Sequence, residues 1–213
     1  MNNPDNVLLE ARGITIWRGD NLLMEDIDIQ VCRGSIIQIQ GTNGSGKTTL
    51  LRALIGLAEY DEGEVFYGGK PFLKVRDQMY SDLLYLGHKA GISPALTPLE
   101  NIRALCPELG QDCRDAVESV LAELAIADRI DLPSAALSAG QKRRITLARL
   151  RLQSARLWVL DEPLTSLDTN GYAWVREEIR QHVGAGGAVI FTTHQSLSFE
   201  PHPVSSIVLG EAL

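Results

Sequence analysis

The chain has 213 residues, of which 45% are hydrophobic and 22% charged, a composition typical of one good-sized folded domain. Its 20 basic and 27 acidic side chains give a net charge of -7, which argues against a nucleic-acid partner, because such binding normally needs a basic face. The longest apolar stretch, 183–191, is nine residues long, whereas a bilayer-spanning helix needs about 20. We therefore expect a folded chain without a membrane span.

The start of the chain, MNNPDNVLLE, has neither a basic segment nor a long apolar core. We therefore expect no secretory signal, and a chain that stays in the cytoplasm. The three cysteines, Cys32, Cys106 and Cys113, are an odd number without a metal-like pairing to histidine. In a reducing compartment this predicts free thiols.

The N-terminal third alternates apolar and polar residues in the manner of strands. Strands are predicted at 7–11, 13–17, 27–31, 35–40 and 63–71, the last ending in a Gly-Gly turn. The segment SIIQIQ at 35–40 leads into a Gly-rich loop, and 48–57 follows with helical apolar spacing. This order predicts a strand, a loop and a crossover helix.

From about residue 88 to 155 the pattern favours helices. Thr97, Pro98 and Glu100 predict a helix start, with a capping threonine, a proline at the first position and a capping-box partner. A second helix is predicted at 115–129, and a third begins near Ser138.

Two buried strands are predicted in the C-terminal part, at 156–161 and 188–194, with a helix at 171–182 between them. The predicted fold class is α/β, with a mixed sheet core and an N-terminal antiparallel β-subdomain. Within a single domain over 1–213, the core and β-subdomain cover about 1–87 and 156–213, and a helical lobe covers about 88–155.

The segment GTNGSGKT fits the pattern G-x-x-x-x-G-K-[ST] and lies between a predicted strand and a predicted helix. Its glycines let backbone N–H groups surround phosphates, and the following helix contributes its positive end. Lys47 is predicted to reach the β- and γ-phosphates and Thr48 to bind Mg²⁺. The alternative, a flexible turn that holds glycine and lysine, accounts for this context less well. The predicted nucleotide-binding residues are Gly41, Thr42, Asn43, Gly44, Ser45, Gly46, Lys47, Thr48 and Thr49.

The predicted strand at 156–161 ends in one carboxylate, Asp161, and a second, Glu162, follows it directly. Asp161 and Glu162 would lie at the carboxyl edge of the sheet, where α/β proteins bind ligands. We assign Asp161 to the magnesium site and Glu162 to the attacking water as general base. A solvated turn is the usual alternative for such a pair, but the phosphate loop favours the catalytic interpretation.

The segment LSAGQ, at 137–141, indicates to which class of nucleotide-binding proteins the chain is similar. Together with GTNGSGKTT, LWVLDEP, SLD and TTH, in their order along the chain, it closely resembles the ATP-binding cassette (ABC) ATPases over nearly the whole sequence. The usual signature is L-S-G-G-Q, so Ala139 departs from it, while Ser138, Gly140 and Gln141 match. The resemblance implies an ATPase that uses ATP and Mg²⁺.

A serine that opens a helix creates an anion site at the helix N-terminus. The resemblance implies that the anion at the signature is the γ-phosphate bound by a second copy, in an ATP-dependent head-to-tail homodimer. It also implies that Asp168 belongs to the D-loop and that His194 contacts the γ-phosphate, acting in catalysis with Glu162 and Lys47. We interpret the basic run 142–144 as a solvated face, in preference to the alternative of direct phosphate contact.

The resemblance also implies roles for two further residues. Trp17 occupies the place of an aromatic residue that stacks on adenine, with burial in the core as the alternative. His88 stands where the family has a glutamine that helps to coordinate Mg²⁺ and water. Because magnesium prefers oxygen ligands, a metal role for His88 competes with a role in sensing the membrane partner.

A narrower resemblance, to the ATP-binding subunits of bacterial heme exporters, rests on GTNGSGKTTLLR, YLGHKAGI, LTPLENI, LSAGQKRRITLARL and LWVLDEP. His88 and Ala139, which depart from the broad family, are also similar to that subgroup. It implies a peripheral ATPase on the cytoplasmic face of the inner membrane, paired with an integral membrane transporter subunit. Hydrolysis would then drive heme export or delivery to a periplasmic heme chaperone during c-type cytochrome maturation. The chain has no C-x-x-C-H motif, so we expect its link to heme-handling proteins to be indirect.

Three alternatives remain open from the sequence. The first is an ABC ATPase subunit for a different cargo, and the second is an ABC ATPase that serves no membrane. The third, a phosphate-loop kinase or GTPase, is disfavoured by LSAGQ and His194. With about nineteen residues after His194, we expect no added regulatory domain.

Overall fold

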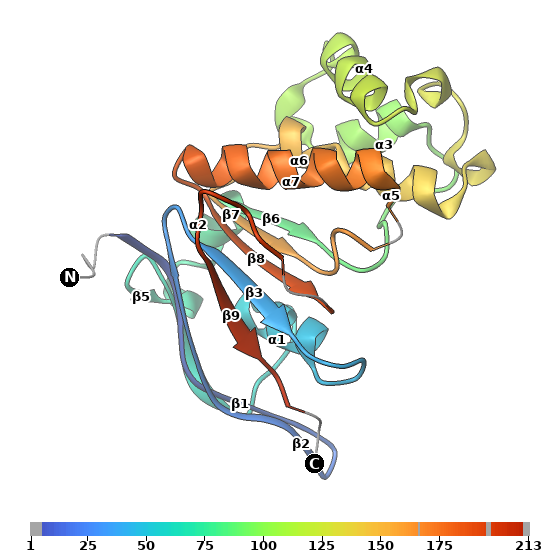
Figure 1. Cartoon of the computed structure of the whole chain (residues 1–213). Helices are drawn as coiled ribbons and strands as arrows, with labels where there is room; N and C mark the ends of the chain where they lie inside the picture. Colours follow the sequence, from blue (N-terminus) through green and yellow to red (C-terminus); the bar gives the residue numbers. More distant parts are fainter. Residues whose placement is uncertain (1–5, 166, 195–196, 211–213) are drawn as a thin grey trace. The chain divides into compact units, whose positions relative to one another are not determined.

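A computed structural model describes residues 6–165, 167–194 and 197–210 (Figure 1). The chain forms two compact units. The described residues of Met1–Tyr85, Ala155–Asp161 and Arg180–Leu213 form the first, which we call the sheet unit. Leu86–Ser154 and Glu162–Ile179 form the second, the helical unit, within the same described ranges.

An antiparallel sheet in the sheet unit has the strand order β2-β1-β4-β5. Its strands are β1 (Val7–Arg18), β2 (Asn21–Cys32), β4 (Glu62–Tyr67) and β5 (Lys70–Pro71). The sequence predicts two strands at 7–11 and 13–17, but the structure has one continuous strand whose register shifts between Ala11 and Ile14. Gly63 adopts φ +104°, and a Cβ there would lie 2.6 Å from the Arg12 carbonyl oxygen. Only glycine allows β4 to approach β1 this closely.

The second sheet has the order β6-β7-β8-β3-β9. Its strands are β3 (Ile36–Gln40), β6 (Leu83–Leu86), β7 (Leu157–Leu160), β8 (Ala188–Thr193) and β9 (Val204–Val208). Strand β3 pairs in parallel with β8 and β9, and β7 pairs in parallel with β8. Parallel strands end at the same edge, so the residues that follow β3, β7 and β8 meet there.

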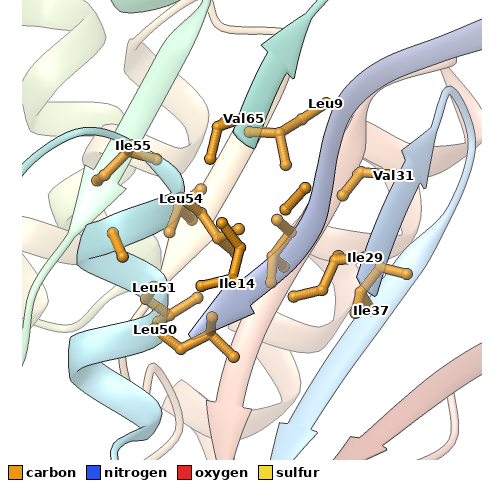
Figure 2. Packing of buried hydrophobic residues seen from close by; sticks show 14 of the residues in the cluster. Leu9, Ile14, Ile29, Val31, Ile37, Leu50, Leu51, Leu54, Ile55 and Val65 are labelled. Atoms are coloured by element: carbon orange, nitrogen blue, oxygen red, sulfur yellow. The ribbon is translucent and has the colours of Figure 1, made fainter. Parts of the chain in front are cut away.

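The core of the sheet unit joins helix α1 (Lys47–Leu54) to β1, as Figure 2 shows. Leu50, Leu51 and Leu54 are fully buried, and they belong to one apolar cluster with Ile14. The helix is shorter than the predicted 48–57, because Gly56 turns the chain at φ +69°. Burial of this apolar helix face fixes the position of the loop that precedes it. The unit also contains η2 (Phe72–Lys74) and α2 (Arg76–Ser81).

The helical unit contains α3 (Pro98–Leu105), α4 (Arg114–Glu123), α5 (Ala139–Leu147) and α6 (Arg149–Leu152). Three short 3₁₀ helices connect them, η3 (Pro107–Leu109), η4 (Ala127–Arg129) and η5 (Ser134–Ala136), and α7 (Thr169–Gly184) begins in this unit. The predicted capping box at Thr97 is confirmed. The predicted helix 115–129 is too long, because Ala125 adopts φ +56° and ends α4 early. The third predicted helix is divided at Ala148.

None of the helices in the described ranges combines the length and the apolar character that a bilayer crossing requires. The three cysteines are free, with Cys106 and Cys113 buried in the core of the helical unit.

Candidate nucleotide site

The phosphate loop lies in the sheet unit, between β3 and α1. Gly44 and Gly46 adopt φ values of +89° and +90°, and Gly46 is the N-cap of the helix. A Cβ on Gly46 would lie 2.7 Å from Cε of Met24, so the glycine also permits close packing on β2. The loop therefore brings free N–H groups of the first helical turn to an exposed edge.

The side chain of Lys47 lies inside this loop and is 5% exposed. Its Nζ donates hydrogen bonds of 2.8 Å to the Gly41 carbonyl and 2.9 Å to the Thr42 carbonyl. Ser45 Oγ is buried and has no hydrogen-bond partner among the described atoms. An ammonium group and an unpaired hydroxyl buried in one loop suit an incoming anion with several acceptor oxygens.

Asp161 follows β7 directly and is 1% exposed. Its Oδ2 accepts a 2.8 Å hydrogen bond from Thr48 Oγ1, and its Oδ1 accepts a 2.7 Å bond from Thr192 Oγ1. The structure thus brings together the two predicted magnesium ligands. Thr192 was not predicted, although its place two residues before His194 in TTH provided a signal.

The remaining residues predicted for the sheet unit have more exposed positions. His194 follows the end of β8 and is exposed, on the same strand edge as the loop after β3. Trp17, near the end of β1, is 48% exposed, so the alternative of a core aromatic is wrong. Its backbone N–H donates a 2.7 Å hydrogen bond to Asp61 Oδ2, which fixes the strand end. Thr42, Asn43 and Gly44 are exposed, and Thr49 is partly buried in α1.

The catalytic candidate Glu162 lies in the helical unit, and its backbone adopts φ +48°. Its Oε2 accepts a 3.3 Å hydrogen bond from Thr165 Oγ1 and lies 3.9 Å from His88 Nδ1. The His88 side chain is 70% exposed. These two predicted site residues therefore lie close together, and Thr165 is a partner that the sequence did not indicate.

Glu162 and His88 line a pocket of about 320 Å³ within the helical unit. The pocket is also lined by Ala90, Ala139, Gly140, Lys142, Arg143 and Thr165. Two signature residues therefore share this pocket with the predicted general base.

The signature begins α5 as predicted. Ser138 is the N-cap, and its Oγ accepts a 3.2 Å hydrogen bond from the Gln141 backbone N–H. The Gln141 side chain accepts a 2.9 Å bond from the Ser138 backbone N–H. Ser138 and Ala139 are exposed. This capping box leaves other N–H groups of the first turn at the surface, available to an anion.

The interpretation of 142–144 as a solvated face is wrong for two of its three residues. Arg143 is 9% exposed and the Arg144 side chain 17%. Arg144 donates a 2.7 Å hydrogen bond to the Leu124 carbonyl and forms a 2.6 Å ion pair with Asp168. Helical periodicity turns these two positions toward the unit, where carbonyl groups supply acceptors.

Asp168 lies just before α7. The Gly171 backbone N–H, and then Arg144, hold the pKa of its carboxyl group below the usual range. Its Oδ1 accepts a 2.9 Å hydrogen bond from that N–H. The predicted D-loop aspartate is therefore anchored to both α7 and the signature helix.

The chain is similar to known proteins over nearly its whole length. The ABC transporter family matches residues 24–165. The "Cytochrome c biogenesis ATP-binding export protein CcmA" of Hahella chejuensis is 46% identical over 190 residues, which cover 89% of this chain and 90% of that protein. The protein of the same name from Vibrio vulnificus is 40% identical over 205 residues, covering 96% of this chain and 100% of that one.

Solved structures of ATP-binding proteins of ABC transporters have the same fold as this chain. The "Putative ABC transporter (ATP-binding protein)" from Pyrococcus furiosus has a TM-score of 0.79 and 25% identity, covering 94% of this chain and 96% of that one. An ATP-binding subunit of an ABC transporter has a TM-score of 0.82 at 23% identity, which shows the fold alone. The chain therefore belongs to the ABC transporter family of nucleotide-binding ATPases and, within it, to the group of proteins named cytochrome c biogenesis ATP-binding export protein CcmA.

Proposed function

We propose that the protein is the ATP-hydrolysing subunit of a membrane complex that exports heme, or delivers it to a periplasmic heme chaperone, in c-type cytochrome maturation. The observation that carries this proposal is 40–46% identity to CcmA export proteins over nearly the whole chain. An ATPase without a membrane-spanning helix in its described part needs an integral membrane partner for export. We place the protein peripherally at the cytoplasmic face of the inner membrane, with indirect links to heme-handling proteins.

The proposed substrate is ATP with Mg²⁺. Asp161 and Thr48 offer a carboxylate and a hydroxyl at hydrogen-bond distance, and magnesium prefers oxygen ligands of this kind. Bound Mg²⁺ would neutralise charge on the phosphate oxygens during transfer to water. Lys47 and the loop 41–49 would hold the phosphates, and Trp17 would stack on adenine.

We further propose that each nucleotide lies between two copies of the chain. The helix start at Ser138, Ala139, Gly140 and Gln141, of which the first two are exposed, would bind the γ-phosphate held by the partner copy. Glu162 would accept a proton from the attacking water, while His194 would contact the γ-phosphate. Asp168 would act at the dimer contact. His88, beside Glu162, stays a candidate for water or metal contact.

The proposed function is tested with the variant Lys47→Ala in place of the native chain in the source bacterium. Covalent heme in c-type cytochromes is measured on a heme-stained gel, with b-type heme as the control. We expect c-type heme to disappear while b-type heme stays normal. Normal levels of both would overturn the cytochrome role and favour a different cargo, while leaving the ATPase family intact.

A further inference from the structure

Arg143 connects two chain segments that carry site candidates. It lies in the second turn of α5, and the residue is 9% exposed. One terminal nitrogen donates a 2.8 Å hydrogen bond to the carbonyl of Gly87, and the other donates a 3.1 Å bond to the carbonyl of Glu162. All three residues belong to the helical unit.

Bonding to both carbonyls at once, as Arg143 does, takes a side chain with two separate donors in a fixed arrangement. The two carbonyls come from segments 75 residues apart in sequence, one directly before His88 and the other at the proposed general base. A guanidinium group reaches both at once with its fixed fork, whereas a lysine ammonium is a point donor on a flexible stem. The bridge therefore depends on arginine itself and not only on positive charge.

The backbone of Glu162 needs such support. Its φ of +48° is uncommon for a residue with a side chain and costs free energy, so neighbouring contacts must hold it. Besides Arg143, the Thr165 backbone N–H donates a 3.2 Å bond to the same Glu162 carbonyl. The Thr165 hydroxyl holds the carboxylate at 3.3 Å. Arg143 fixes the backbone from which that carboxylate extends.

We propose that Arg143 is a positioning residue for Glu162, and that it links the signature helix to the general base of the same chain. This inference rests on the proposed roles of Glu162 and the signature. Arg143 lies five residues after Ser138, about 7.5 Å along one helix. Because a short helix moves as a rigid body, any shift of α5 when the signature engages a partner's phosphate is passed to the Glu162 carbonyl.

The first test compares Arg143→Ala and Arg143→Lys with the unchanged chain. Since misplacement of a catalytic group by about 1 Å costs on the order of 100-fold in rate, we expect kcat for ATP to fall roughly 10- to 100-fold in Arg143→Ala. We expect the Kd for ATP to change by less than about twofold, because Arg143 makes no proposed contact with the nucleotide. Arg129→Ala removes a half-exposed arginine of the same unit and serves as the matched control.

Chemical rescue separates positioning from general stabilisation. We expect millimolar guanidinium to restore part of kcat in Arg143→Ala, while it has no effect on Arg143→Lys or Arg129→Ala. If Arg143→Ala does not fold, Arg143→Lys serves as the test variant. We then expect its kcat to be lower than that of the unchanged chain, while its thermal midpoint stays the same. A kcat equal to that of the unchanged chain in both variants, or a parallel loss of kcat, ATP affinity and thermal midpoint, overturns the proposal.

A double variant separates this inference from the proposed function. Glu162→Gln should trap an ATP-bound dimer, and we expect Arg143→Ala with Glu162→Gln to dimerise with ATP equally well. Loss of that dimer would show that Arg143 acts on dimerisation and contradict its role through the base. A Glu162→Gln variant that hydrolyses ATP at the normal rate would instead overturn the proposed role of Glu162.

Discussion

The hydroxyl of Thr48 donates a 2.8 Å hydrogen bond to the carboxylate of Asp161, across 113 residues of sequence. The contact joins the first turn of α1 to the end of β7 inside the sheet unit. Thr192 holds the other carboxylate oxygen at 2.7 Å, so the acidic group is oriented and nearly fully buried. The two proposed magnesium ligands are therefore in place through contacts within the fold.

Asp161→Asn keeps the size of this side chain but removes its charge. We expect hydrolysis of ATP to fall about 100-fold or more, because the amide is a poor magnesium ligand. Nucleotide binding without Mg²⁺ should change little. The measurement is ATPase rate against Mg²⁺ concentration, with excess EDTA as the metal-removal control. A variant whose rate and Mg²⁺ dependence match those of the unchanged chain would contradict the metal assignment.

Lys47→Ala removes the buried ammonium group from the phosphate loop. Because hydrogen bonds to charged groups contribute about 1.5–3 kcal/mol, we expect ATP affinity to fall at least roughly tenfold. Titration calorimetry measures the affinity, and thermal unfolding checks that the variant is folded. Lys74→Ala, which changes an exposed lysine of the same unit, is the control. Unchanged ATP affinity in Lys47→Ala would refute the assignment of the loop.

Trp17 is exposed at the end of β1, where its ring is available to a nucleotide base. Aromatic stacking contributes about 0.5–1.5 kcal/mol, so Trp17→Ala should weaken ATP binding roughly two- to tenfold, and Trp17→Phe much less. Inorganic tripolyphosphate has no base and should bind all three proteins equally. If tripolyphosphate affinity falls together with ATP affinity, Trp17 does not act through stacking.

The ring of His182 stacks on Trp158 at 3.9 Å between centroids and 6° between planes. Burial lowers the pKa of His182 to about 4 from the ordinary 6.5, partly opposed by hydrogen bonds to the backbone of Ala188 and Arg156. The neutral ring therefore stabilises the fold fully above about pH 6.5, and this contribution is lost as pH falls toward about 4.

We expect that loss to reach about 3 kcal/mol in the free energy of unfolding, since one pKa unit corresponds to about 1.4 kcal/mol. Urea unfolding at pH 7.5, 5.5 and 4.5 measures it. His182→Phe keeps the stacked ring without a titrating group, and its stability should depend less on pH in this range. Equal pH dependence of His182→Phe and the unchanged chain would contradict the assignment, with His202→Asn as the control.

Local sequence signals predicted much of the fold. The Thr97 capping box, the strand before the phosphate loop and the start of α5 at Ser138 all follow from short-range chemistry. The ends of helices were harder to predict, because α4 ends at Glu123, just before the positive φ of Ala125, and alanine does not favour a positive φ. Strand β9 was missed since its alternation of apolar and polar residues is weak.

The candidate site, like the fold, was predictable from the sequence only in part. Asp161, Lys47 and Thr48 follow from motifs, and the contact of Thr48 with Asp161 follows from parallel strands that end at one edge. The bridge from Arg143 to Glu162 was not predictable, because it depends on a buried guanidinium meeting carbonyls far away in sequence. In the sequence alone, a run of basic residues resembles a solvated face, because tertiary packing decides which of its side chains are buried.

The measurement that tests the shared nucleotide site most directly is ATP hydrolysis by a mixture of two inactive variants. Lys47→Ala lacks the phosphate-loop cation, and Gly140→Asp places an acid at the signature. Apart from its two chain neighbours and the nearby helix backbone, no described atom lies within 4 Å of a Cβ on Gly140, so this variant should fold.

A mixed dimer of the two variants has one site with both an intact phosphate loop and an intact signature. We predict that each variant alone is inactive and that ATP hydrolysis returns when the two are mixed. Mixtures as inactive as the separate variants, under conditions in which the unchanged chain hydrolyses ATP, would contradict a site built from two copies.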